Sequence, residues 1–331
     1  MKIKKTIVLT DNKIGSNSQA IALAEALGAE FEIIPLEYNL LARLPNFLLP
    51  FGFKQVKKPN LNEILRNIEP EYIISASRKS GFVSASIKKI KKNAKNIHIL
   101  NPGINFSNFD LVVLPNHDIV RAVPSNVFRI SGALNNISQN IISELENFKN
   151  IYPELAKRDS NKKIITVLVG GNTKKFKYDQ TSATKFTETL AKISQNMQAK
   201  FMITLSRRTN GILKELLLEF AKNHNHFIYD PEKPGYNPYP AMLDNSEFVI
   251  STIDSISMCS EVASLGKPLY LYKPENFNSA KHFEFSKELE RIGAAKFITP
   301  DVNNLQEYNY EPLSETKKLV DYINSSNLSV K

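Results

Sequence analysis

Tryptophan is absent from this sequence of 331 residues, and cysteine occurs once, at Cys259. A single cysteine excludes an internal disulfide and is typical of a reducing compartment, so we expect a cytoplasmic protein. No apolar run reaches the roughly 18 residues that a membrane-spanning helix needs. The apolar run behind the basic N-terminus is too short for a signal peptide, and we interpret residues 4–10 as a first strand.

Two kinds of ligand motif are also missing. The sequence has no C-x-x-C pair and no clustered histidine and cysteine spacing, so it predicts no metal site. The loop after the first strand, residues 10–19, is not a G-x-G-x-x-G sequence, so the dinucleotide-binding fingerprint is absent there. We therefore expect neither a metal nor a bound cofactor.

Positive charge is in excess, because 43 lysines and arginines outnumber 33 acidic residues and leave a net charge of +10. This balance favours anionic partners: phosphorylated ligands, nucleic acid or an anionic membrane. A solvated basic surface is the alternative explanation. No signature of a nucleic-acid-binding fold accompanies the lysine runs, so we expect no nucleic-acid partner.

One apolar stretch, residues 33–53 (IIPLEYNLLARLPNFLLPFGF), is unusual. Pro35, Pro45 and Pro50 interrupt it, so it is neither a single helix nor a membrane span. It is either a surface loop that touches lipid or an apolar acceptor, or a buried loop that closes over a core. The first interpretation would place the protein peripherally on the inner face of a membrane.

Short apolar runs alternate with helical patterns along nearly the whole chain. We expect strands at residues 4–10, 31–35, 72–76, 97–100, 111–114, 127–130, 163–170, 200–205, 227–229, 248–251 and 269–272. Crossovers of helical length between strands indicate a parallel, doubly wound α/β sheet. A polar stretch near residues 150–162 divides the pattern. We predict two Rossmann-like domains, residues 1–150 and 160–312, with a C-terminal helix and tail at 313–331.

Ligands bind open α/β folds at the carboxyl ends of the strands, so we expect functional residues just after strands. In the first half these are Asp11, Gly15 and Gln19 (TDNKIGSNSQ), Ser75 and Arg78 (SASRKSG), and His117 and Asp118 (NHD). A histidine beside an aspartate at a strand end indicates a candidate general base, and a serine with an arginine at a helix start indicates an anion site. Capped turns are the structural alternative.

Three loops follow strands in the second half. They contain Gly170, Gly171 and Asn172 (LVGGNTKKF), Ser206, Arg207 and Arg208 (LSRRT), and Asn237 and Tyr239 (GYNPYPAML). The paired glycines allow close approach of the backbone to a ligand, and the two arginines at an expected helix start form a candidate diphosphate clamp. Asn237 is expected to cap the next helix, and Tyr239 either stacks on a base or packs against the protein.

The stretch STIDSISMCSEVASLGKPLY is interpreted as a strand end followed by a helix from Asp254. Ser255 and Ser257 lie in its first turn, where free N–H groups can bind phosphate. Glu261 follows Ser257 by four residues, so both lie on one face, and its carboxylate can accept the two hydroxyls of a ribose. Together with the arginines, the stretch predicts a nucleoside diphosphate site.

These stretches, together with FDLVVLPNHD, occur in the order seen in the mitochondrial-fission (elongated-mitochondria) protein family, which the chain resembles over roughly residues 5–300. The resemblance implies a GT-B fold, with two Rossmann-like domains facing a cleft, and a glycosyltransferase activity. The helix after Asp254 is also similar to the donor site of the N-acetylglucosaminyltransferase of peptidoglycan synthesis. That similarity implies that Ser255 and Ser257 hold the diphosphate and Glu261 the ribose.

The chain departs from the family pattern at two positions. Ser16 stands where the family commonly has a histidine, and Ser77 replaces the glycine of a Ser-x-Gly-Arg loop. No D-x-D triplet occurs, in agreement with a GT-B enzyme that needs no metal.

These observations predict a metal-independent glycosyltransferase with a nucleotide-diphosphosugar donor. Asp118 or His117 would deprotonate the hydroxyl of an unknown acceptor, which we expect to be lipid-linked or membrane-associated. Two alternatives stay open: a non-catalytic interaction protein on a GT-B scaffold, of the mitochondrial-fission recruitment type, and a nucleotide-sugar epimerase.

Overall fold

The computed structural model describes residues 3–28, 30–44, 52–57, 65–120, 123–157, 162–299 and 302–328. The chain folds into two compact units, of which the first combines Met1–Asn135 with Ser314–Lys331 and the second is Asn136–Leu313. This division falls earlier than the predicted boundary near residues 150–162. The reason is that Ile137, Ile141 and Phe148, on the helix before that boundary, pack into the core of the second unit.

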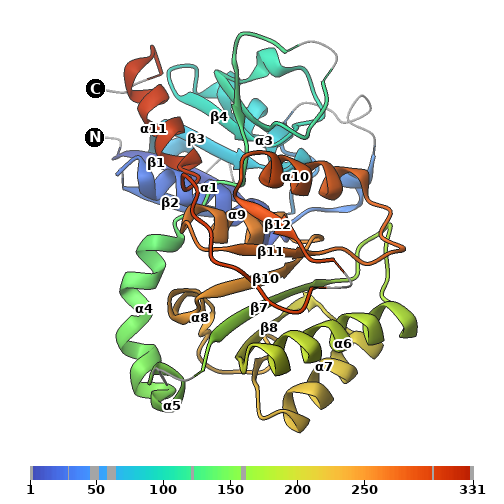
Figure 1. Ribbon diagram of the computed structural model, residues 1–331. Helices are drawn as coiled ribbons and strands as arrows, with labels where there is room; N and C mark the ends of the chain where they lie inside the picture. Colours follow the sequence, from blue (N-terminus) through green and yellow to red (C-terminus); the bar gives the residue numbers. More distant parts are fainter. Residues whose placement is uncertain are drawn as a thin grey trace. The chain divides into compact units, whose positions relative to one another are not determined.

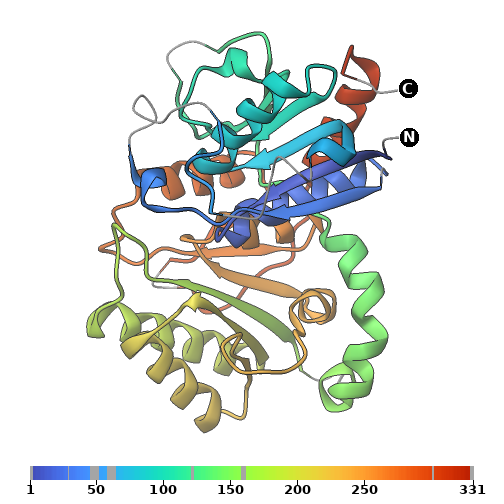
Figure 2. The same ribbon diagram turned by 180° about the vertical axis from the view of Figure 1, so that it is seen from behind.

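The first unit is built on a six-stranded parallel sheet in the order β2-β1-β3-β4-β5-β6. Its strands are β1 (Ile3–Thr10), β2 (Phe31–Pro35), β3 (Ile68–Ala76), β4 (Lys95–Ile99), β5 (Leu111–Pro115) and β6 (Val127–Ile130). Its helices are α1 (Ile14–Ala26), α3 (Arg78–Ile90) and α11 (Glu315–Ser325), with the 3₁₀ turns η1 (Leu40–Arg43) and η3 (Phe106–Asn108). Figures 1 and 2 show β1 beside β3 within this sheet.

Helices cover both faces of the first sheet. Ile74 and Val113 pack on one face with residues of α1 and α11, whereas Ile7 and Ile73 pack on the other face with residues of α3. Successive side chains of a strand point to opposite faces, so a continuous apolar run such as YIISA needs cover on both sides. The packing therefore confirms the doubly wound arrangement that the sequence predicts.

The second unit contains a six-stranded parallel sheet in the order β12-β11-β10-β7-β8-β9. Its strands are β7 (Ile164–Gly171), β8 (Lys200–Arg208), β9 (Phe227–Tyr229), β10 (Phe248–Thr252), β11 (Leu269–Tyr272) and β12 (Ala295–Phe297). Its helices are α4 (Ile137–Ile151), α5 (Pro153–Ala156), α6 (Gln180–Asn196), α7 (Gly211–Asn223), α8 (Tyr239–Asn245), α9 (Ile256–Ser264) and α10 (Ala280–Arg291). Figure 1 shows α6 and α7 side by side against β7 and β8.

Two cores lie on the faces of the second sheet. Val167 and Phe201 pack with residues of α6 and α7, and Ile164 and Met202 pack with residues of α4, α5 and α8. The sequence patterns missed α10 and β12, because α10 is largely charged and buries few large side chains, among them Phe285 and Leu289.

Candidate functional site

The second sheet reverses its strand order at β7, since β8 and β9 follow on one side while β10, β11 and β12 follow on the other. Open α/β sheets bind ligands at such a switch point, outside the carboxyl ends of the strands. The carboxyl ends of β7, β8 and β10 carry Gly170, Arg208 and Thr252. The candidate site therefore begins where three neighbouring strands end.

Gly170 and Gly171 make room for the protein's own chain. A Cβ at Gly170 would overlap the carboxylate of Asp254 and lie 2.7 Å from its Oδ1. A Cβ at Gly171, which has a φ of +119°, would lie 2.6 Å from the backbone nitrogen of Thr209. The predicted close approach is thus an approach of β7 to Asp254 and to the end of β8.

Asp254 and Arg208 form an ion pair at the centre of this cluster. The Arg208 guanidinium lies 3.1 Å from Asp254 Oδ2 and donates a hydrogen bond to the Asp254 carbonyl at 3.2 Å. The Asp254 side chain is 1% exposed, and its Oδ2 contact is an ion pair without hydrogen-bond alignment. Burial raises the pKa of Asp254, and Arg208 opposes that rise. One side of the 41%-exposed Arg208 side chain is thus anchored while the rest stays accessible.

The LSRRT stretch is the end of a strand and not the predicted helix start, because β8 continues through Arg208 and α7 begins at Gly211. Alternation along the strand then separates its side chains. The Ser206 hydroxyl donates to the Gly170 carbonyl, so it builds the loop. Arg207 is exposed, and it makes no ion pair or hydrogen bond with any residue that the structure describes.

The helix that was expected from Asp254 begins at Ile256, with Ser255 as its N-cap. The Ser255 side chain makes no capping hydrogen bond. Neither Ser255 nor Ser257 donates or accepts a side-chain hydrogen bond within the described part of the chain, and both are half-buried. Two unpaired hydroxyls therefore stand beside the N-terminal N–H groups of a nine-residue helix, the environment that binds anions.

Glu261 lies on α9, and among the described residues its carboxylate has one hydrogen-bond partner. The hydroxyl of Tyr239, the first residue of α8, donates a hydrogen bond to Glu261 Oε2. Burial raises the pKa of Glu261 to about 7, and the Tyr239 hydrogen bond lowers it. Tyr239 thus bonds to Glu261, the residue that is predicted to bind the ribose. This contact differs from the predicted stacking of Tyr239 on a base.

Two predicted asparagines build loops. Asn172 Nδ2 donates to Asn210 Oδ1 at 2.6 Å, and Asn172 Oδ1 accepts from the backbone of Tyr178 at 2.9 Å. Asn237 Oδ1 accepts from the Tyr239 backbone at 3.1 Å, which fixes the entry to α8. Both side chains shape the loops of the candidate site.

In the first unit the switch point lies at β1, between β2 and β3. Asp11 is there, and its Oδ2 accepts a hydrogen bond from the Ser77 hydroxyl at 2.7 Å. Ser77 has a φ of 122°, a conformation that favours glycine and costs other residues about 1–3 kcal/mol. This backbone would suit the glycine that the family resemblance implies at position 77, and the Ser77 hydroxyl holds Asp11.

The other predicted residues near the switch point of the first unit make contacts within the protein. Gly15 lies inside the first turn of α1 and not in a tight turn, and Gln19 is buried with its Nε2 bonded to the Gly15 carbonyl at 3.2 Å. Ser75 is fully buried, and its hydroxyl pairs with His98 Nδ1 at 2.7 Å. Arg78 reaches the Ala42 carbonyl at 3.4 Å. These contacts are internal, so they leave Asp11 as the group best placed at the switch point.

His117 and Asp118 follow β5, which β4 separates from β3. The Asp118 backbone N–H donates to Pro115 at 3.0 Å, and Arg129 donates to the carbonyls of Pro115 and Asp118 at 2.7 and 2.9 Å. The structure therefore places both residues in a turn that Arg129 organises, beyond the switch point at β1 and β3.

Three residues of the second-unit cluster were not among the predicted site residues. Tyr178 is buried, and burial together with the nearby Asp254 raises the pKa of its hydroxyl. The Thr252 hydroxyl accepts from the Gly170 N–H at 2.9 Å. His282, at the start of α10, has a pKa lowered to about 4 by burial and by Arg208. A spacing signal could not find them, since each is defined by a contact with a distant part of the chain.

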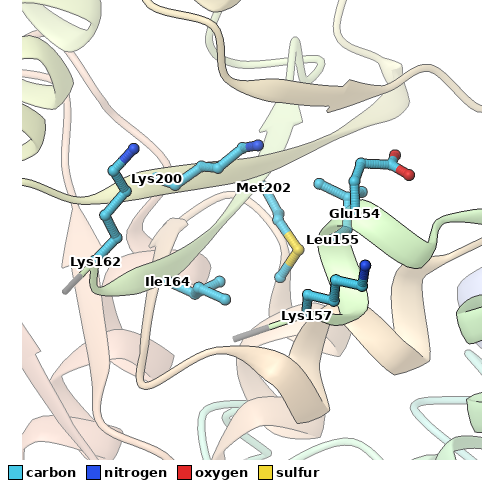
Figure 3. A pocket seen from close by; sticks show the side chains of 7 residues that line it. All are labelled: Glu154, Leu155, Lys157, Lys162, Ile164, Lys200 and Met202. Carbon is cyan, nitrogen blue, oxygen red and sulfur yellow. The ribbon is translucent and has the colours of Figure 1, made fainter. Parts of the chain in front are cut away.

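A pocket of roughly 320 Å³ lies at the opposite edge of the second sheet, where β7 and β8 begin. Its lining consists of Glu154, Leu155, Lys157, Lys162, Ile164, Lys200 and Met202 (Figure 3). None of the predicted site residues is in this lining, so the pocket is separate from the candidate site.

The apolar stretch at residues 33–53 is described only in part, because residues 45–51 lie outside the described ranges. Within the described part, Leu40 on η1 is 73% exposed and Leu41 is 43% exposed. This part is therefore on the surface. No helix in the described ranges has the length and apolar character needed to cross a bilayer.

Solved structures with this architecture define the class of the protein. The UDP-GlcNAc 2-epimerase of Methanocaldococcus jannaschii matches with a TM-score of 0.60 at 15% identity, over 98% of this chain and all of its own. The UDP-GlcNAc 2-epimerase of Neisseria meningitidis, solved with UDP-GlcNAc bound, gives 0.54 at 14%, over 97% and 91%. MurG of Acinetobacter baumannii gives 0.51 at 14%, over 97% and 100%. The chain has the GT-B fold that nucleotide-sugar epimerases and the glycosyltransferase MurG share.

Sequence comparison identifies the family within that class. The chain belongs to the mitochondrial fission ELM1 family, whose profile matches residues 14–326. It is 36% identical to uncharacterized protein RP120 of Rickettsia prowazekii over 96% of both chains. It is 24% identical to the mitochondrial fission protein ELM1 of Arabidopsis thaliana over 75% of this chain and 61% of that protein, so it spans less than two thirds of the plant relative. The family resemblance drawn from the motifs is confirmed.

Proposed function

We propose that this protein is a metal-independent glycosyltransferase that uses a nucleotide-diphosphosugar as donor. The observation that carries the proposal is the pair of hydroxyls of Ser255 and Ser257, which bond to none of the described residues, at the N-terminus of α9 beside the anchored Arg208. Helix N–H groups, hydroxyls and a guanidinium are the donors that stabilise a diphosphate leaving group. Fixed donors of this kind lower the barrier to loss of that charge.

The remaining donor residues have proposed roles that follow from their positions. Arg207 is free to reach a phosphate from the end of β8, and Glu261 is the proposed ribose ligand one turn into α9. Proteins of the same fold are solved with UDP-GlcNAc bound, which supports a nucleotide-sugar ligand for this chain. On the acceptor side, we propose Asp118 or His117 as the base, as the sequence predicted, with Asp11 as a further candidate because of its place at the switch point.

The donor site is tested by calorimetry with UDP. Arg207→Ala and Glu261→Ala are each expected to weaken UDP binding by about 10- to 100-fold, because each removes hydrogen bonds to a charged group. Arg291→Ala is the matched control, since Arg291 is an exposed arginine of the same unit that pairs with Glu288 on its own helix. If the wild-type protein bound no nucleoside diphosphate, the proposal would be wrong.

A second candidate is a nucleotide-sugar epimerase. It is supported by the TM-score of 0.60 with the Methanocaldococcus jannaschii epimerase, against 0.51 with MurG. Product analysis with a radiolabelled UDP-sugar separates the two: transfer releases UDP and labels an acceptor, whereas epimerisation leaves the label on a nucleotide sugar.

We further propose that the first unit docks on an anionic membrane that carries the acceptor. The patch consists of Leu40, Leu41 and Arg43 on η1 with Lys54 beside it, because Asn39 Nδ2 bonds to the Lys54 carbonyl at 2.6 Å. Exposed leucines next to exposed cations match the apolar and anionic layers of a lipid surface.

Sedimentation with vesicles of phosphatidylglycerol and phosphatidylcholine tests the patch. Leu40→Asp is expected to lower vesicle binding about tenfold, since it removes apolar burial and adds a charge that anionic lipid repels. Ile142→Asp is the control, because Ile142 is 76% exposed on α4 in the other unit. Equal loss in both variants, or binding to neutral vesicles alone, would contradict the proposal.

A further inference from the structure

The contact between α8 and α9 carries a further inference, which rests on the proposed nucleotide site. Tyr239 starts α8, its ring packs against the core of the second unit, and its hydroxyl bonds to Glu261 Oε2. The tyrosine backbone is fixed in turn by Asn237. The hydroxyl is therefore presented to the carboxylate by a side chain held at both ends.

The second oxygen of this carboxylate is available. Glu261 Oε1 makes no hydrogen bond with the described residues, and the Glu261 residue as a whole is only partly buried. A carboxylate has lone pairs for about four hydrogen bonds, of which Tyr239 uses one. The remaining capacity suits a pair of adjacent hydroxyls.

We infer that Tyr239 is a positioning residue that fixes the Glu261 carboxylate to accept the ribose hydroxyls, so that the site selects ribonucleotides over deoxyribonucleotides. An ionised carboxylate accepts hydroxyl hydrogen bonds more strongly than a protonated one. The selectivity therefore depends on the charge of Glu261, and that dependence gives the inference a signature that a purely structural contact lacks.

The charge of Glu261 changes near neutral pH. Burial raises its pKa to about 7, so ionisation is largely complete above pH 8 and largely lost below pH 6. The titratable groups beside it are Tyr239 on α8 and Cys259 on its own helix. Burial and Glu261 raise the pKa of Tyr239 above its ordinary value, and burial raises the pKa of Cys259 to about 12. Neither group ionises between pH 6 and 8.5.

The experiment compares UDP with 2′-deoxy-UDP by calorimetry from pH 6 to pH 8.5. The two probes share the same phosphate ionisation, with a pKa near 6, so the ratio of their Kd values isolates the ribose hydroxyl. For the wild-type protein we expect about a tenfold preference for UDP at pH 8.5, falling to about twofold at pH 6. This comparison needs no mutation.

Tyr239→Phe supplies the second measurement. Loss of the hydroxyl removes the hydrogen bond that lowers the pKa of Glu261, so the rise in UDP preference should move to higher pH. It should also shrink by about threefold at pH 7.5. Tyr310→Phe is the matched control, because the Tyr310 hydroxyl bonds to the Lys267 carbonyl at 2.8 Å. A thermal melt confirms that both variants are folded.

The outcomes separate the two proposals. If UDP binds but its preference over 2′-deoxy-UDP is the same at all pH values, or the same in Tyr239→Phe and wild type, the inference is overturned and the nucleotide site stands. If neither probe nor another nucleoside diphosphate binds, both proposals fail. A preference that rises with pH and shifts in Tyr239→Phe alone supports both.

Discussion

Gly170→Ala is expected to lower the free energy of unfolding by about 3 kcal/mol, because the new methyl group overpacks a buried contact. The Cβ would overlap the Asp254 carboxylate, which is buried and held by Arg208. Neither segment can withdraw easily, since Gly170 belongs to the central strand β7 and Asp254 lies in the short connection between β10 and α9. Urea unfolding followed by circular dichroism measures the loss.

Two further variants show whether the carboxylate is the cause. In an Asp254→Ala background the same glycine substitution should cost less than about 1 kcal/mol, a coupling of about 2 kcal/mol between residues in contact. Gly211→Ala is a control with a φ of +56° and open space around the new Cβ, so it should cost only about 1 kcal/mol of backbone strain. Additive losses of Gly170→Ala and Asp254→Ala would contradict the packing argument.

Arg208→Met should lower the free energy of unfolding by about 2 kcal/mol at pH 8 and by less at pH 5. The substitution leaves the Asp254 carboxylate buried without its counter-ion, which costs about 3–5 kcal/mol in a closed site and less where the partner is partly exposed, as Arg208 is. Urea unfolding at both pH values measures the difference.

The way in which this loss of stability changes with pH follows from the Asp254 carboxyl group. Burial raises the pKa of Asp254 above its ordinary value near 4, and removal of Arg208 raises it further. Because the folded state favours protonated Asp254, protonation of this carboxyl stabilises the fold at low pH. This stabilisation is lost as the pH rises through the pKa that Asp254 has in the folded state. The deficit of the variant therefore grows from pH 5 to pH 8.

Two matched variants complete this test. Asp254→Asn, added to Arg208→Met, removes the unpaired charge and should recover most of the loss at pH 8. Arg207→Met should change stability by less than about 0.5 kcal/mol, because Arg207 is exposed and makes no ion pair or hydrogen bond with a described residue. An Arg208→Met protein as stable as Arg207→Met at both pH values would show that the ion pair does not contribute.

The class of fold and the neighbourhood of the site could be predicted from the sequence because both depend on local pattern. Apolar runs such as KIITVLVG alternate with helical segments, and this alternation commits the chain to parallel strands with helices on both faces. Parallel strands all point the same way, so residues that follow them gather at one edge. The sequence places Gly170, Arg208 and Asp254 near one another for that reason, since each follows a strand.

The ends of the strands and helices were harder to predict from the sequence. The sequence predicted that β8 would end before Ser206, because the apolar run ends at Leu205 and serine is typical of a helix start. Pairing with β7 extends the strand to Arg208 instead, with the register shifted beside Gly171. The division of the chain at Asn135 escaped for a similar reason, since the packing of α4 into the core of the second unit decides it.

By itself the sequence determined a doubly wound α/β chain, its family and the loops in which the candidate residues lie. Only the tertiary structure decided what those residues touch. It placed Gly170 against the Asp254 side chain and Gly171 against the backbone at the end of β8. It also joined Arg208 to Asp254 across 46 residues and Tyr239 to Glu261 across 22. The physical reason is that strand and helix periodicities act over a few residues, whereas a buried charge or hydroxyl finds its partner wherever folding brings one within about 3 Å.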